Sequence, residues 1–170
     1  RDTAACICYA ADHLSKKGHG DEVMAIIYAD HLIQKPENFK EALTFIEQHI
    51  KETNALGVIG VRAKSPNPNL GYIRLGKVLN EEGPHEIYEL KNFVEKPTKE
   101  VAKTFLDSYR YLWNTGLYVW KVSTILEKFK EHAKEVYKAI VEDGIYEKAP
   151  KISIDYALME KIAPQMVHVI

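Results

Sequence analysis

An acid, a cation and an amide stand near the ends of two predicted strands, where they could bind one small molecule. Glu95 and Lys96 lie in the run Phe93-Val94-Glu95-Lys96-Pro97, and Asn114 lies in Trp113-Asn114-Thr115-Gly116. A lysine ammonium is a compact charge suited to a phosphate, while a carboxylate and an amide can accept from and donate to ring hydroxyls. This combination of side chains indicates the binding of a phosphorylated sugar.

Two aspartates from opposite ends of the chain could supply a metal site. Asp30 follows the apolar run Val23–Tyr28, and ligand sites in open α/β sheets lie beyond the carboxyl ends of strands. Asp155 lies at the predicted start of a helix. Two carboxylates together with phosphate oxygens and water suit Mg²⁺. Alternatively, Asp30 caps the turn before Pro36, and Asp155 is an ordinary acid favoured by the helix dipole.

Simpler interpretations also exist for the first group. Because Pro97 pushes the preceding residue towards extended geometry, we expect Glu95 and Lys96 to leave the strand on opposite sides. The two could also form an exposed ion pair at the strand end. Asn114-Thr115-Gly116 could be turn chemistry, or the glycine could allow a ligand close to the backbone.

Composition restricts the class of protein. The 170 residues are enough for one domain, 46% of them are hydrophobic, and the formal net charge is −1. The charges form no long block of one sign, so we expect neither a nucleic-acid surface nor a membrane surface. The two cysteines, Cys6 and Cys8, cannot build a disulfide framework, and no apolar run approaches a membrane span. We expect a soluble, cytoplasmic protein.

Periodicity predicts alternating helices and strands in the first third of the chain. Helical spacing covers residues 2–14 and 37–51, and the continuous apolar runs 23–28 and 56–61 are typical of strands buried on both faces. The order strand, helix, strand predicts a β-α-β unit with a parallel pair, and hence an α/β fold with a mixed, mostly parallel sheet and flanking helices.

An inserted β-ribbon is predicted after that unit. Residues 71–76 should pair with 87–94 across a turn near Gly83. Thr98 should cap a following helix. The remaining predicted elements are a strand at 117–120, helices at 125–132 and 134–141, a last helix from Ser153 or Asp155 to Ile162, and a strand-like run at 166–170.

Six blocks along the chain, in order and spacing, resemble the mannose-1-phosphate guanylyltransferases, also called GDP-mannose pyrophosphorylases. The blocks are Arg1-Asp2-Thr3-Ala4, Ala29-Asp30-His31-Leu32-Ile33, Gly71-Tyr72-Ile73, Phe93-Val94-Glu95-Lys96-Pro97, Trp113-Asn114-Thr115-Gly116 and Ser153-Ile154-Asp155-Tyr156-Ala157-Leu158-Met159-Glu160. The resemblance implies a Rossmann-like (GT-A-like) nucleotidyltransferase fold. It also implies guanylyl transfer from GTP to mannose 1-phosphate, giving GDP-mannose and pyrophosphate.

The resemblance also implies a role for each site residue. Asp30 and Asp155 would bind Mg²⁺, and Lys96 would hold the attacking phosphate; these three would be catalytic. Glu95 and Asn114 would bind sugar hydroxyls. In addition, the backbone at Gly71 would close over the hexose, and Arg1 would lie near the nucleotide. The protein could form a homo-oligomer.

The chain departs from the family pattern in several places. The family's glycine-rich nucleotide loop should lie upstream of Arg1, so we expect residues 1–170 to be a partial nucleotidyltransferase domain without turnover of its own. The smaller departures are Tyr28 for a proline, Asp2 for an asparagine, Ala5 for a proline, Pro68-Asn69-Leu70 for Thr-Gly-Tyr and Thr115 for a serine. Two alternatives remain: a nucleotidyltransferase for another sugar 1-phosphate, and a non-catalytic regulatory module that binds sugar phosphates.

Overall fold

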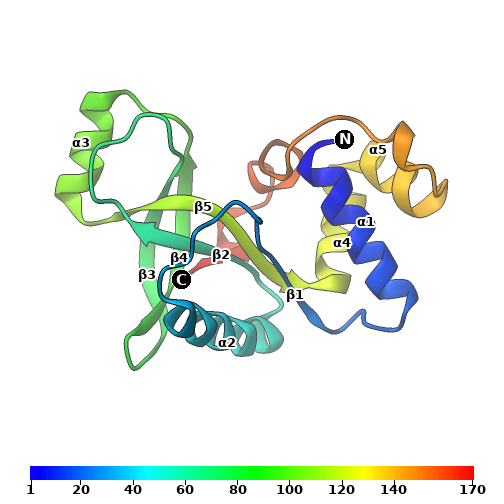
Figure 1. Ribbon diagram of the computed structural model, residues 1–170, viewed down its shortest axis with the longest axis horizontal. Helices are drawn as coiled ribbons and strands as arrows, with labels where there is room; N and C mark the ends of the chain where they lie inside the picture. Colours follow the sequence, from blue (N-terminus) through cyan, green and yellow to red (C-terminus); the bar gives the residue numbers. More distant parts are fainter.

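A computed structural model describes all residues 1–170 as a mixed sheet with helices at both ends and on one face (Figure 1). The strands are β1 (Val23–Ile26), β2 (Leu56–Arg62), β3 (Tyr72–Glu82), β4 (His85–Val94), β5 (Tyr111–Lys121) and β6 (Val167–Val169). The helices are α1 (Asp2–Lys16), α2 (Pro36–Thr53), α3 (Lys99–Ser108), α4 (Val122–His132) and α5 (Lys134–Tyr137). None of the helices is both long enough and apolar enough to cross a membrane.

The sheet is mostly antiparallel, so the predicted mostly parallel sheet is wrong. Its strand order is β1-β5-β2-β6-β4-β3, and only β2 and β6 pair in parallel. The first two strands run in the same direction, but they are separated by β5, which pairs with each of them in antiparallel register. The predicted hydrogen-bonded parallel pair of a β-α-β unit is therefore absent.

The strand β5 shows why the relative direction of neighbouring strands was predicted wrongly. Leu117 and Val119 pack in a cluster under α2, whereas Tyr118 and Trp120 pack in the larger core on the opposite face. Side chains alternate between the faces of a strand, so an apolar run means that both faces are covered. It does not determine the direction of the neighbouring strands.

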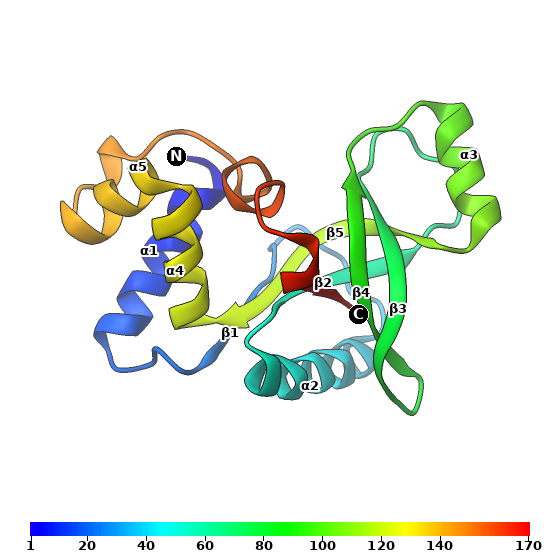
Figure 2. The ribbon, with the colours of Figure 1, turned by 180° about the vertical axis from the view of Figure 1, so that it is seen from behind.

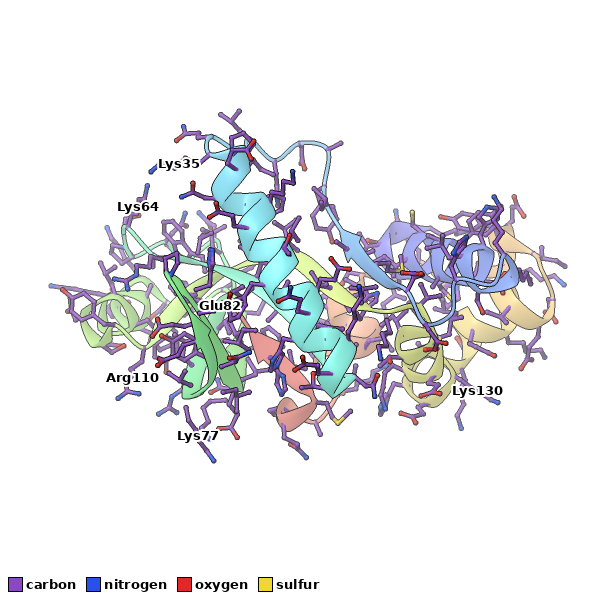
Figure 3. All side chains as sticks on the ribbon, turned by 90° about the horizontal axis from the view of Figure 1, so that it is seen from below. Lys35, Lys64, Lys77, Glu82, Arg110 and Lys130 are labelled. Atoms are coloured by element: carbon purple, nitrogen blue, oxygen red, sulfur yellow. The ribbon has the colours of Figure 1, made fainter.

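The predicted β-ribbon is present as the pair β3 and β4, which joins at a turn containing Gly83. The beginning of β3 also pairs with β5, so the ribbon is anchored to the main sheet. Figure 3 shows Glu82 at the tip of the ribbon beside α2, with Lys35 at the start of that helix. The ribbon thus reaches the side of the helix that covers one face of the sheet.

The helices begin and end at residues with suitable local chemistry. Thr98 caps α3, as predicted, by accepting a hydrogen bond from the backbone N–H of Val101. Pro36 occupies the first turn of α2, and Asn54 ends that helix in the left-handed conformation.

The last predicted helix differs from the prediction. A single π-helical turn, η3, covers Asp155–Met159, after which the chain continues through a short 3-10 turn (Pro164–Met166) into β6. The predicted helix at 134–141 is likewise split into the short α5 and a π-helical turn at Lys138–Glu142.

Three helices gather at one end of the molecule, and a single helix lies at the other end. α1, α4 and α5 lie together near the N-terminus, and α3 lies beside the ribbon. β5 runs from α3 to the three other helices (Figures 1 and 2). The segment before η3 is tied to α1 because the backbone N–H of Ile154 donates to the hydroxyl of Thr3 at 2.8 Å. These contacts place the start of the chain beside Asp155.

Candidate sugar-phosphate site

One polar cavity of about 430 Å³ gathers five of the seven predicted site residues. Only two of the 12 residues that line it are hydrophobic, which suits a hydroxylated ligand better than an apolar one. The lining residues are Asn69, Leu70, Gly71, Glu95, Lys96, Asn114, Thr115, Gly116, Ser153, Asp155, Tyr156 and Glu160. They come from the loop before β3, the end of β4, the middle of β5 and the start of η3.

Gly71, Glu95 and Asn114 form one wall of the cavity. The backbone N–H of Asn114 donates to the carbonyl of Gly71 at 2.8 Å, which joins the loop to β5. A Cβ added at Gly71 would lie 2.5 Å from Oε2 of Glu95 and 3.5 Å from Cβ of Asn114. Because no side chain fits there without displacing the carboxylate, the glycine allows Glu95 to lie against the backbone.

Glu95 and Lys96 lie on the same side, so the expectation that they point in opposite directions is wrong. Both line the cavity, and Nζ of Lys96 lies 3.5 Å from Oε1 of Glu95. The strand ends at Val94, and Lys96 has a φ of 43°, a left-handed conformation in place of the extended one expected before Pro97. Such unusual backbone geometry is concentrated at functional sites.

The Asn114-Thr115-Gly116 segment is a bulge in β5. The register changes from Ile59 opposite Leu117 to Gly60 opposite Asn114, which leaves two extra residues on β5. The side-chain oxygen of Asn114 accepts from the backbone N–H of Gly116 at 3.0 Å. The predicted turn chemistry is present, and it turns this stretch of β5 into the cavity wall.

Asp155 is held by a residue that the sequence reasoning did not single out. The hydroxyl of Tyr118 donates a hydrogen bond of 2.6 Å to Oδ1 of Asp155. Burial raises the pKa of Tyr118 well above its ordinary value, and the negative charge of Asp155 acts in the same direction. A tyrosine within an apolar strand is typical of a core residue, so no signal in the sequence indicated this contact.

Asp30 and Arg1 do not line the cavity. Asp30 is exposed in the turn that follows β1, which is a short strand at the edge of the sheet and not the fully buried strand predicted. Arg1 is exposed beside the start of α1. These two predicted site residues are therefore not among those that line the cavity.

The charges of both predicted metal-binding aspartates act on Tyr28. Burial raises the pKa of Tyr28, and the charges of Asp155, Asp2 and Asp30 raise it further. The charges of carboxylates from three segments of the chain therefore act on one phenol. No group of three or more histidine, cysteine, aspartate or glutamate side chains could hold a metal ion by itself. Carboxylate oxygens are donors that suit Mg²⁺, and such an ion would need its other ligands from phosphate and water.

A second hollow of about 400 Å³ lies between the ribbon, β2 and β5 and has a different character. Ten of its 15 lining residues are hydrophobic, and none of the predicted site residues is among them. Its chemistry gives no reason to prefer it as a sugar-phosphate site.

Comparison with known proteins identifies the class of protein to which this chain belongs. The family model described as "Nucleotidyl transferase" matches residues 1–156, so the chain belongs to the nucleotidyl transferase family. Among curated relatives, it is 32% identical to a mannose-1-phosphate guanylyltransferase of Escherichia coli, over 98% of this chain and 39% of that protein. It is 33% identical to a mannose-1-phosphate guanylyltransferase of Klebsiella pneumoniae, over 98% of this chain and 38% of that protein.

A solved structure agrees with this similarity. The crystal structure of a mannose-1-phosphate geranyltransferase from Thermus thermophilus matches 100% of this chain and 50% of that one, with 31% identity and a TM-score of 0.85. The chain thus spans about two fifths of the length of the curated relatives above and half of this structural relative.

Proposed function

We propose that this chain carries the sugar-phosphate part of the active site of a mannose-1-phosphate guanylyltransferase. The protein would transfer a guanylyl group from GTP to mannose 1-phosphate, giving GDP-mannose and pyrophosphate. The observation that carries the proposal is the polar cavity, where Gly71, Glu95, Lys96, Asn114 and Asp155 converge from four separate segments. The names of the relatives supply the substrates.

Each residue at the cavity has a chemically suitable role. Lys96 would bind the phosphate of the sugar through a charge-assisted hydrogen bond. Glu95 and Asn114 would bind ring hydroxyls, and the backbone at Gly71 would close over the hexose. No covalent intermediate on the enzyme is needed, because the attacking group is an oxygen of the sugar's own phosphate.

Asp155 and Asp30 would bind Mg²⁺ together with phosphate oxygens. When bound, the ion would neutralise the negative charge that develops during phosphoryl transfer. Asp155 faces the cavity, whereas Asp30 would approach from the turn after β1. Arg1 would lie on the side of the nucleotide.

A calorimetric titration of this chain with mannose 1-phosphate, glucose 1-phosphate and mannose tests the proposal. We expect selective binding of mannose 1-phosphate, and Lys96→Ala should weaken it roughly 10- to 150-fold, because a hydrogen bond to a charged group contributes about 1.5–3 kcal/mol. Lys96→Ala should change the binding of mannose itself far less.

Lys91→Ala is a matched control. Like Lys96, Lys91 forms an ion pair with a nearby glutamate: its Nζ lies 2.8 Å from Oε2 of Glu89. Lys91 does not line the cavity. Equal losses for the phosphorylated and the free sugar would remove Lys96 from the phosphate role. No binding of mannose 1-phosphate by folded chain would contradict the proposed site.

A further inference from the structure

Tyr118 is completely buried, yet its hydroxyl reaches a carboxylate at the polar cavity. The ring has 0% exposure and stacks on Trp120, with ring centroids 5.3 Å apart and an interplanar angle of 15°. Neighbouring core residues therefore fix the ring, and the position of the hydroxyl follows from the position of the ring. The 2.6 Å bond to Oδ1 of Asp155 is thus made by a rigid donor.

The carboxylate of Asp155 needs such a partner. The torsion that rotates a carboxylate is broad, so an aspartate at a cavity wall does not keep one orientation without a hydrogen bond. Asp155 is half-buried, and the π-helical turn that begins with it is only five residues long. Among the side chains around Asp155, Tyr118 is the one that donates a hydrogen bond to the carboxylate.

A second residue of the cavity acts on the same hydroxyl. The side chain of Asn114 acts on Tyr118 in the direction that lowers its pKa, which is the effect of a donor on the phenol oxygen. Tyr118 is therefore influenced by Asn114, on the bulge of β5, and bonded to Asp155, at the start of η3.

We propose that Tyr118 is a positioning residue that holds Oδ1 of Asp155 and leaves Oδ2 free to bind a divalent cation carried by the phosphate of the sugar. This inference rests on the proposed function of the cavity. Partners that hydrogen-bond to metal-binding carboxylates orient them, and their loss typically costs 10- to 100-fold in metal affinity. Tyr118 would act through Asp155 without touching the substrate.

Tyr118→Phe tests the proposal because it removes only the hydroxyl. Calorimetry should give a 10- to 100-fold weaker affinity for Mg²⁺ in the presence of saturating mannose 1-phosphate. The affinity for mannose 1-phosphate without Mg²⁺ should stay within about twofold. Thermal unfolding, followed by circular dichroism, should show that the variant is folded.

Tyr88→Phe is the matched control. The hydroxyl of Tyr88 donates to Oε2 of Glu86 at the same distance of 2.6 Å, but this pair lies on the ribbon and neither residue lines the cavity. Its removal should leave Mg²⁺ affinity unchanged.

A measurement on the unaltered chain covers the case in which Tyr118→Phe does not fold. Mg²⁺ added with mannose 1-phosphate should shift the NMR signals of the Tyr118 ring and leave those of Tyr88 in place. Equal Mg²⁺ affinity of the unaltered chain and Tyr118→Phe, or an unshifted Tyr118 ring on saturation, would overturn the inference. Failure of the unaltered chain to bind mannose 1-phosphate would instead contradict the proposed function itself.

Discussion

Replacing Gly71 by alanine should separate the binding function of the cavity from the stability of the fold. The added methyl group would lie 2.5 Å from Oε2 of Glu95, whereas atoms in favourable contact lie about 3.5 Å apart or more. The carboxylate must therefore retreat by about 1 Å. Glu95 is exposed, so its flexible side chain can move into solvent.

The two expected magnitudes differ because they have different origins. The free energy of unfolding should change by no more than about 1 kcal/mol, since an exposed side chain is displaced and Gly71 has no left-handed backbone to strain. Binding of mannose 1-phosphate should lose the hydrogen bond of a sugar hydroxyl to a charged carboxylate. That bond contributes about 1.5–3 kcal/mol, which is roughly 10- to 150-fold in affinity.

The assay combines calorimetry with urea unfolding of the same preparation. Gly20→Ala is the matched control, since nothing lies within 4 Å of a Cβ added at Gly20 and Gly20 does not line the cavity. It should leave both quantities almost unchanged. Unaltered affinity in Gly71→Ala, combined with weakened binding in Glu95→Gln, would refute the argument that the glycine makes room for the carboxylate.

Three further predictions concern other parts of the molecule. Iodoacetamide at pH 8 should label the exposed Cys6 but not Cys8, because burial raises the pKa of Cys8 to about 12; peptide mass spectrometry that finds equal labelling in the folded chain would contradict this. His49 and His168 form a 2.7 Å hydrogen bond, and burial lowers the pKa of both, so the unfolded chain binds protons first and stability should fall as the pH drops below about 6.5. Urea unfolding at pH 7.5 and 5.5 should show this loss, and it should shrink in His168→Gln. Phe129→Ala should cost about 3–5 kcal/mol of unfolding free energy, because this ring is fully buried in the main core; a loss below 1 kcal/mol would show that the core collapses around the gap.

The positions of most helices and strands were predictable from local patterns. The first helix, the ribbon, the strand through Leu117–Trp120 and the cap at Thr98 are all present. Each depends on residues close together in the chain: an apolar period, a turn glycine or a side chain that caps its own helix. The blocks of residues were also sufficient to indicate the family that the comparisons establish.

Strand direction and the surroundings of the site were not predictable in this way. An apolar strand shows that both its faces are covered, but antiparallel and parallel neighbours cover them equally well. Lys96 adopts a left-handed backbone against the local preference before Pro97, so Glu95 and Lys96 share one side of the cavity. Here the tertiary context overrides a local tendency.

The sequence by itself determined which residue types are available for sugar-phosphate chemistry and where the local elements begin. The tertiary structure alone decided that β5 separates β1 from β2, that five polar residues share one cavity and that Tyr118 holds Asp155 across 37 positions of the chain. The physical reason is the distance along the chain over which each kind of interaction acts. Periods, caps and turns act over a few residues, whereas strand pairing and side-chain contacts depend on which distant segments bury their surfaces together.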